Sequence, residues 1–125
     1  MKLKNMKDTQ YQPIKMPNGE IKYILITYVD VGHGPMVYLI FFKDTNKFYI
    51  GSTKNGDDRI QGHFTHESKK NGVPYYVYQE ALKNYNIEVR MLRSCNSIPE
   101  AKYWENNYLR EGRKKFGDRL LNIRN

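Results

Sequence analysis

Apolar side chains fill every position from Met36 to Phe42, so both alternating faces of an extended chain would be apolar there. Such a pattern is typical of a central strand that is buried on both sides of a sheet. The turn residues "DTN" follow at 44–46, and the run "KFYIGS" then brings the chain back. The pattern predicts an antiparallel hairpin, which Gly51 ends by allowing a bend or the close approach of another chain.

Two further strand patterns flank this hairpin. Asn18 and Gly19 stand between two extended runs, which is a strong signal for another hairpin. We interpret residues 1–35 as an N-terminal β extension of one or two strands added to the main sheet, and residues 36–125 as the main domain. Further along, "IEVRML" alternates apolar residues at 87, 89 and 91 with charged ones, which predicts an edge strand buried on one face.

Three helices are predicted between and after these strands. The first runs through "RIQGHFTHES" and would be capped by Asp57 or Asp58. The second follows Pro74 and stops at Asn86, with an apolar stripe of Tyr78, Ala81, Leu82 and Tyr85. The third begins at the capping-box signature "SIPE" and spans residue 98 to about 111. Together these elements predict an α+β fold, in which a small antiparallel sheet is flanked by helices.

Length and cysteine content limit the class of protein. A chain of 125 residues is long enough for one domain with its own core. Cys95 is the single cysteine, so an internal disulfide framework and a cysteine-rich metal cluster are excluded, and a reducing, intracellular setting is expected. We find neither a signal peptide nor an apolar run of about 18 residues, and we therefore expect a soluble protein that does not bind membranes.

The charge balance indicates a polyanionic partner. Lys and Arg number 21 against 13 Asp and Glu, which gives a formal net charge of +8. Nucleic acid is the polyanion that such an imbalance favours, although a merely basic soluble protein would show it too. The segment "REGRKKF" concentrates the charge, and its basic residues are Arg110, Arg113, Lys114 and Lys115. A solvated helix face would have a similar composition.

Glu105 is the most informative anomaly in the third predicted helix. The apolar stripe of that helix consists of Ala101, Trp104, Tyr108 and Leu109. At about 100° per residue Glu105 falls inside this stripe, where a carboxylate is seldom buried unless it is paired. An arginine, a metal ion or a hydrogen-bond network would supply the partner. A structural salt bridge, or a position at the edge of the stripe that reaches solvent, would explain the residue equally well.

The first predicted helix places Arg59 and His63 on one face, because they are four residues apart. Arginine clamps phosphate with two parallel hydrogen bonds, and histidine titrates near neutral pH. The two hairpin tyrosines, Tyr38 and Tyr49, occupy strand positions where aliphatic side chains would fill a core as well. Taken alone, each of these features is also compatible with a structural role, since aromatic residues favour strands.

The combination of these residues resembles the GIY-YIG nuclease superfamily. Tyr38 in "MVYLI", the literal "YIGST" at 49–53, and Arg59 and His63 after it stand in the order of that family. Glu105 in "AKYWENNYL" and Asn122 in "RLLNIRN" continue the series. The resemblance covers residues 36–124, and the first half-motif departs from the family because it has Met36 and Val37 before the tyrosine.

The resemblance implies a metal-dependent DNA endonuclease whose products carry 5′-phosphate and 3′-hydroxyl ends. It implies that Glu105 binds one divalent cation, Mg²⁺ or Mn²⁺, and that Arg59 neutralises the scissile phosphate. Further implied roles are general base for Tyr38, positioning for Tyr49, proton relay for His63 and geometric support for Asn122. We expect the nucleic-acid contacts to come from the helical cluster at 110–115 and from Gly51, Ser52, Thr53 and Lys54.

Ionising the base is the demanding step in this scheme. An unperturbed phenol has a pKa of about 10, so its ionisation at neutral pH costs about 4 kcal/mol. A neutral His63 that accepts the proton, with Arg59 and the cation nearby, would lower that cost. The two phenols, the guanidinium and the acid are therefore expected to face one another across a single pocket.

The alternative function is a basic nucleic-acid-binding module that keeps the fold without cleaving. Within the nuclease hypothesis, double-stranded DNA is the expected substrate, and the resemblance admits a homing, restriction, repair or phage enzyme. One active site cuts one strand per encounter, so a double-strand break would require a homodimer or two visits.

Overall fold

The structure is a computed structural model that describes residues 7–56 and 74–122. Its five strands are β1 (Lys7–Lys15), β2 (Ile21–Val29), β3 (Met36–Phe42), β4 (Lys47–Thr53) and β5 (Asn86–Ser94). The described helices are α2 (Tyr75–Ala81), α3 (Ile98–Phe116) and the short 3₁₀ helix η1 (Gly117–Arg119). The first predicted helix, with Arg59 and His63, lies outside the described residues. The α+β class is confirmed.

The N-terminal hairpin predicted from Asn18 and Gly19 is formed by β1 and β2. Gly19 takes a φ of 93°, which a glycine adopts without a steric penalty. The sheet order is β1-β2-β5-β3-β4, and the hairpin joins the sheet through a parallel pairing of β2 with β5. The sheet is therefore mixed, because this parallel pair adds to the antiparallel pairs predicted from the sequence.

Strand β3 is central, as its apolar run predicts, and β4 pairs with it in antiparallel register. The prediction that "IEVRML" forms an edge strand is wrong. β5 lies between β2 and β3, and Ile87 and Val89 are buried. Glu88 and Arg90 form an ion pair with each other on the opposite face, which the helices leave partly uncovered. A central strand therefore alternates between apolar and charged residues here, which is the pattern that predicted an edge strand.

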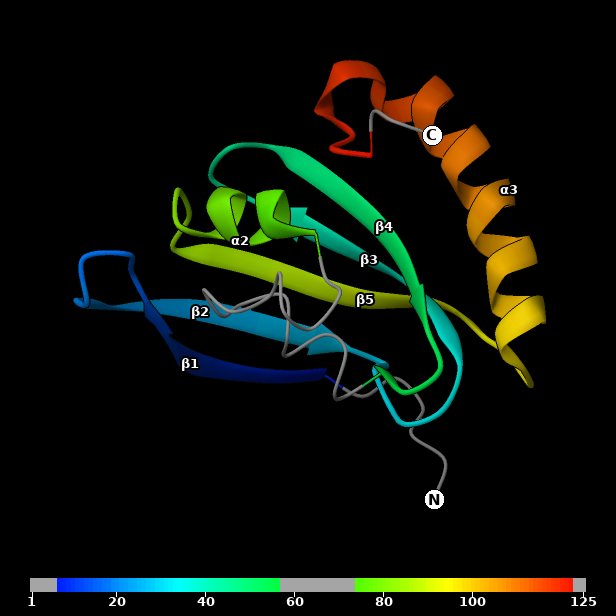
Figure 1. Ribbon diagram of the computed structural model, residues 1–125, viewed down its shortest axis with the longest axis horizontal. Helices are drawn as coiled ribbons and strands as arrows, with labels where there is room; N and C mark the ends of the chain where they lie inside the picture. The colour runs from blue at the N-terminus through cyan, green and yellow to red at the C-terminus, as the bar shows by residue number, and fades with distance from the viewer. Residues whose placement is uncertain (1–6, 57–73, 123–125) are drawn as a thin grey trace.

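Two apolar clusters fill the two faces of the sheet. On one face α2 packs Val77, Tyr78 and Ala81 against a cluster that includes Ile24, Ile26, Tyr38, Ile40, Ile87 and Val89. On the other face α3 covers a cluster that includes Val37, Phe48, Ile50 and Leu120. Figure 1 shows α3 alongside β3 and β4, at the opposite side of the molecule from the β1–β2 hairpin. The site residues on β3 and β4 therefore stand between two packed layers.

The two described α-helices differ in length from the predictions. Helix α2 ends at Ala81, so Tyr85 is not part of its stripe but is exposed, and Asn86 opens β5. Helix α3 begins as predicted, since the Ser97 side chain accepts a hydrogen bond from the Glu100 backbone N–H. It continues to Phe116 instead of ending near 111, and Gly117 follows it with a φ of 57°. Neither helix is long and apolar enough to cross a membrane.

The turn between β3 and β4 is fastened to the segment between α2 and β5. Asn84 is fully buried, and its amide oxygen accepts hydrogen bonds from the backbone N–H groups of Asp44 and Thr45. In return, the Asp44 carboxylate accepts hydrogen bonds from the backbone N–H groups of Tyr85 and Asn86, which lower the pKa of Asp44. This reciprocal pair fixes the end of the hairpin on which both tyrosines stand.

Candidate active site

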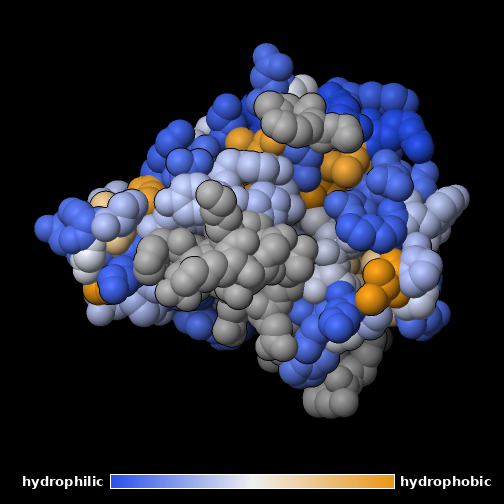
Figure 2. All heavy atoms as spheres, in the orientation of Figure 1, coloured by the Kyte–Doolittle hydropathy of each residue, from blue (hydrophilic) through white to orange (hydrophobic). Residues whose placement is uncertain are grey.

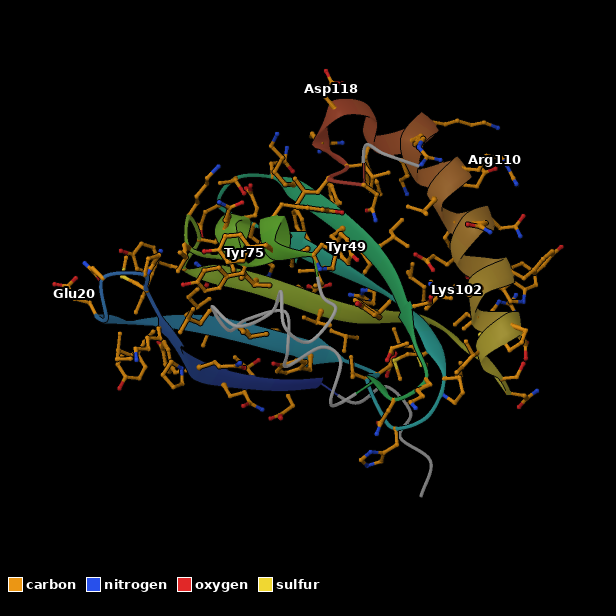
Figure 3. All side chains as sticks on the ribbon, in the orientation of Figure 1. Glu20, Tyr49, Tyr75, Lys102, Arg110 and Asp118 are labelled. Carbon is orange, nitrogen blue, oxygen red and sulfur yellow. The ribbon has the colours of Figure 1, made fainter. Side chains whose placement is uncertain are left out.

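Tyr38 and Tyr49 lie side by side on the face of the sheet that carries α2. Tyr38 is paired with Gly51 in the β3–β4 register, whereas Tyr49 is paired with Ile40, so the two tyrosines are diagonal neighbours. Their ring centroids are 6.4 Å apart, and the side chains are only 1% and 7% exposed. Tyr76 of α2 meets the Tyr49 ring edge-on at 6.0 Å. Figure 3 shows Tyr49 on β4 beside α2.

Gly51 provides the space that the Tyr38 ring occupies. A Cβ atom at Gly51 would lie 2.6 Å from the Tyr38 hydroxyl oxygen and 2.7 Å from its Cζ, and 3.0 Å from a ring carbon of Tyr49. Contacts this short are not tolerated in folded proteins. The glycine of "YIGST" is therefore required by the close crossing of two side chains over the β4 backbone, not by an unusual backbone angle.

We expect Gly51→Ala to push the Tyr38 ring out of its position. Overpacking of this kind costs about 1–3 kcal/mol of folding free energy, so the protein should still fold. Nicking of supercoiled plasmid should fall far more than the melting temperature, because the Tyr38 hydroxyl is displaced. Gly32→Ala, at a position with open space around the added Cβ, is the matched control. Unchanged nicking by Gly51→Ala would contradict a role for the Tyr38 position.

Glu105 is mostly buried between α3 and β4, with 16% of its side chain exposed. Its Oε1 atom accepts a hydrogen bond from the Ser52 hydroxyl at 2.5 Å and lies 3.4 Å from the Lys102 Nζ atom. The Ser52 hydroxyl thereby ties the carboxylate of α3 to β4. The anomaly seen in the sequence is thereby partly explained, because the carboxylate is held against the strand that carries the "YIGST" motif.

The acid and the phenols reach β4 from its two faces. Side chains alternate along a strand, so Ser52 points to the α3 side, whereas Tyr49 and Gly51 point to the α2 side. β4 is the last strand in the order of the described sheet. The prediction that Tyr38, Tyr49 and Glu105 line a single pocket is not tested by these contacts and stays a prediction.

Asn122 holds the outer border of β4. Its side-chain oxygen accepts a hydrogen bond from the Ile50 N–H at 2.9 Å, and its Nδ2 atom donates to the Ile50 carbonyl oxygen at 2.8 Å. The Leu121 N–H donates to the Phe48 carbonyl oxygen, and residue 120 forms a parallel bridge with Phe48. The amide of Asn122 thus replaces a neighbouring strand, and it fixes the backbone between Tyr49 and Gly51.

The residues that we expect to contact nucleic acid differ in how exposed they are. Gly51 and Ser52 are buried, Thr53 is half-buried and Lys54 is exposed. Because Ser52 already hydrogen-bonds Glu105, its position suits orientation of the acid better than a contact to nucleic acid. The four basic residues of the helical cluster, Arg110, Arg113, Lys114 and Lys115, are exposed on α3. Figure 2 shows hydrophilic side chains gathered over this part of α3, and Figure 3 shows Arg110 turned away from the sheet.

The sequence analysis did not identify two residues that the structure places near the site. Lys102 contacts Glu105 from one turn earlier on α3, a spacing of three that could have revealed it. Arg93 of β5 stacks its guanidinium 3.8 Å from the centre of the Trp104 ring, and its buried Nε finds no hydrogen-bond partner among residues 7–56 and 74–122. No local pattern could have found that contact, because it depends on how α3 crosses β5.

The oxygen chemistry around Glu105 fits a magnesium-type ion. Mg²⁺ keeps several waters and binds through one or two carboxylates together with substrate phosphate. Among residues 7–56 and 74–122 no group of three or more His, Cys, Asp and Glu is placed to hold a metal. Glu105 would accordingly be the protein carboxylate that binds the ion, with water and phosphate oxygens completing the shell.

The described residues form an α+β fold, in which helices cover both faces of a five-stranded mixed sheet. A scan against family models matches residues 34–118 to the GIY-YIG catalytic domain, which is more than half of the chain. The chain therefore belongs to the GIY-YIG family, whose domain generally indicates an endonuclease. No curated protein and no solved structure matched the chain.

Proposed function

We propose that this protein is a divalent-metal-dependent endonuclease that hydrolyses phosphodiester bonds of double-stranded DNA. The observation that carries the proposal is Glu105, a largely buried carboxylate held by Ser52 against the strand of the "YIGST" motif. Membership in the GIY-YIG family supports the same class of reaction. The proposed products carry 5′-phosphate and 3′-hydroxyl ends.

In this proposal Glu105 holds one Mg²⁺ or Mn²⁺ ion. When bound, such an ion polarises a phosphoryl oxygen and stabilises the departing 3′ oxygen, which lowers the barrier by several kcal/mol. Lys102 lies 3.4 Å from the same carboxylate oxygen, so its ammonium neutralises the acid until a cation or a phosphate arrives. Ser52 keeps the carboxylate oriented in both states through its short hydrogen bond.

The phenols supply the proton chemistry in this scheme. Tyr38, with its ring held over Gly51, gives its phenolic proton to His63 and accepts the proton of the attacking water. Tyr49 beside it positions the water or the phosphate. Asn122 maintains the β4 backbone between these groups. Arg59 and His63 complete the proposal, the first as a phosphate clamp and the second as a proton relay, although both lie outside the described residues.

Phosphate contacts away from the reaction centre are assigned to the helical cluster at 110–115. Lys114 lies 3.8 Å from the exposed Glu111 of the same helix, a contact that solvent weakens. Arg110 hydrogen-bonds Asn107 on α3, which leaves its remaining donors for phosphate. Such contacts favour DNA binding without reading its sequence.

The biological setting is also a proposal. The abundance of Lys, Asn, Tyr and Ile is typical of proteins encoded by AT-rich genomes, which suits a phage or mobile element with a homing or restriction role inside a cell. Two strand breaks at one site would need a homodimer or two successive encounters. A non-catalytic nucleic-acid-binding module is the alternative, and the basic surface of α3 would serve it equally.

Incubation with supercoiled plasmid separates the two functions. We expect open-circular and linear DNA to appear with Mg²⁺ or Mn²⁺ and to vanish when a chelator is added. Sequencing the new ends reports polarity, stagger and site preference together. Retarded but intact plasmid at every salt and metal condition would overturn the nuclease proposal and favour the binding module.

A further inference from the structure

The N-terminal hairpin exposes two tyrosines on one face. Tyr11 is 72% exposed and Tyr23 is 61% exposed. Tyr11 is paired with Leu25 and Tyr23 with Pro13, so the two rings belong to adjacent rows of the same face. Residues 14, 24 and 26 alternate with them and are fully buried in the cluster under α2. The tyrosines therefore stand on the other face of the sheet, the one that α3 covers farther along.

Helix α3 does not extend over this part of the sheet. It packs on β3 and β4, and Figure 1 shows it at the opposite side of the molecule from the hairpin. The exposure of Ile21, at 50%, agrees with an uncovered surface. We call the face formed by Tyr11, Pro13, Ile21, Tyr23 and Leu25 the hairpin face. It precedes the residues that match the family, so the nuclease domain by itself does not account for it.

The charges beside the hairpin face are complementary to phosphate. Lys15 is paired with Ile21 and is exposed on the same face. On β5, which follows β2 in the sheet, Arg90 pairs with Glu88 at 2.9 Å. Lys43, which follows β3, lies 3.8 Å from the same carboxylate. Lys15 on β1 and Arg90 on β5 therefore place positive charge on this face beside the tyrosines. Aromatic rings with flanking cations are the arrangement that binds single strands, in which bases stack and phosphates meet positive charge.

The size of the hairpin face argues against a second copy of the chain as its occupant. Strands of nine residues span about 30 Å, and two of them are about 10 Å wide, so the face offers about 300 Å². A stable protein interface buries about 800 Å² on each partner. A copy of the chain would also bring the same positive charge to the contact. A strand of unpaired nucleotides needs less area and carries the opposite charge.

We propose that the hairpin face binds unpaired bases of a nucleic-acid strand, with Tyr11 and Tyr23 as stacking platforms. Lys15 and Arg90 contact the neighbouring phosphates. This surface lies at the far side of the sheet from β4, so it adds a ligand class to the proposed cleavage of duplex DNA. A single-stranded segment beside the cut site would be held there.

The test measures binding of an oligothymidylate and of a duplex of equal length, in chelator so that nothing is cleaved. Stacking on an aromatic side chain is worth about 5- to 150-fold in affinity per base. The double variant Tyr11→Ala with Tyr23→Ala should therefore bind the oligothymidylate at least about 25-fold more weakly, with a change in duplex affinity below about threefold. The slope of affinity against salt should stay the same, because no phosphate contact is removed.

Two variants control for folding and for general loss of aromatic surface. Replacing both tyrosines by Phe keeps the rings and should keep binding. Tyr85→Ala removes a tyrosine of similar exposure, 64%, that lies under the Lys22 ammonium on the other face of the same hairpin. Its affinity for the oligothymidylate should change by less than about threefold.

Several results would overturn the proposal. The first is equal affinity of the double Ala variant and the unchanged protein for the oligothymidylate. The second is an equal loss for duplex and single strand, which would indicate a general defect. The third is that the unchanged protein sediments as a dimer whereas the double Ala variant sediments as a monomer. This result would make the hairpin face a contact between copies of the chain. None of these outcomes depends on cleavage, so failure here is distinct from failure of the nuclease proposal.

Discussion

Glu105→Gln is expected to lower the rate of plasmid nicking by about a thousandfold, since a metal-bound carboxylate supplies several kcal/mol of transition-state stabilisation. Glutamine has the same shape, and its amide oxygen can still accept the hydrogen bond from Ser52. The fold should therefore be retained, while the negative charge that would hold the proposed cation is lost. The measurement is the initial rate of nicking at saturating Mg²⁺, compared with DNA affinity in chelator, which should be unchanged or higher.

Glu111→Gln is the matched control for this variant. It removes the same charge from the same helix, at a side chain that is 72% exposed and pairs with Lys114 at 3.8 Å. Its nicking rate should stay within about threefold of the unchanged protein, because an exposed pair contributes little. If Glu105→Gln retained nicking within that same range, the carboxylate would not be the metal ligand.

Tyr38→Phe is the second change with a large expected effect. General-base catalysis contributes about 10²- to 10⁴-fold, so the single-turnover rate should fall by at least about a hundredfold. The ring of Tyr38 is 1% exposed and packs in the core, and phenylalanine fills the same space. The unfolding free energy should change by only about 1 kcal/mol, the net worth of one hydrogen bond.

Tyr78→Phe is the matched control for Tyr38→Phe, and it should lower stability without affecting nicking. Tyr78 is equally buried, and its hydroxyl donates to the Lys15 carbonyl oxygen at 2.5 Å, away from β4. Burial raises the pKa of this phenol, so it stays protonated and its hydrogen bond is structural. Urea denaturation should show a loss of about 1 kcal/mol with nicking unaffected. Equal nicking by the Tyr38 and Tyr78 variants would remove Tyr38 from the chemistry.

The β3–β4 hairpin and the start of α3 were predictable because their signals are local. An apolar run on both faces of β3, a turn of Asp, Thr and Asn, and a serine that caps Glu100 each act within a few residues. The place of β5 was not predictable in this way. Its position between β2 and β3 depends on a parallel pairing with the N-terminal hairpin, which no alternation inside β5 can encode.

The candidate site shows the same division. Glu105 stood out because helical periodicity placed a charge in an apolar stripe, and the structure finds it mostly buried. Its partner Ser52 could not be identified from the sequence, because 53 residues separate them and their contact depends on how α3 crosses β4. The reason for Gly51 was likewise hidden, since the clash it avoids involves a tyrosine on another strand.

The hydrogen bonds between Asn122 and Ile50 join positions 72 residues apart. Because Asn122 follows α3 in the sequence, it is synthesised only after that helix. A chain broken before Leu120 would leave this border of the sheet unpaired, open to strands from other molecules. The border of β4 beside Tyr49 is consequently completed only by the last residues that the structure describes.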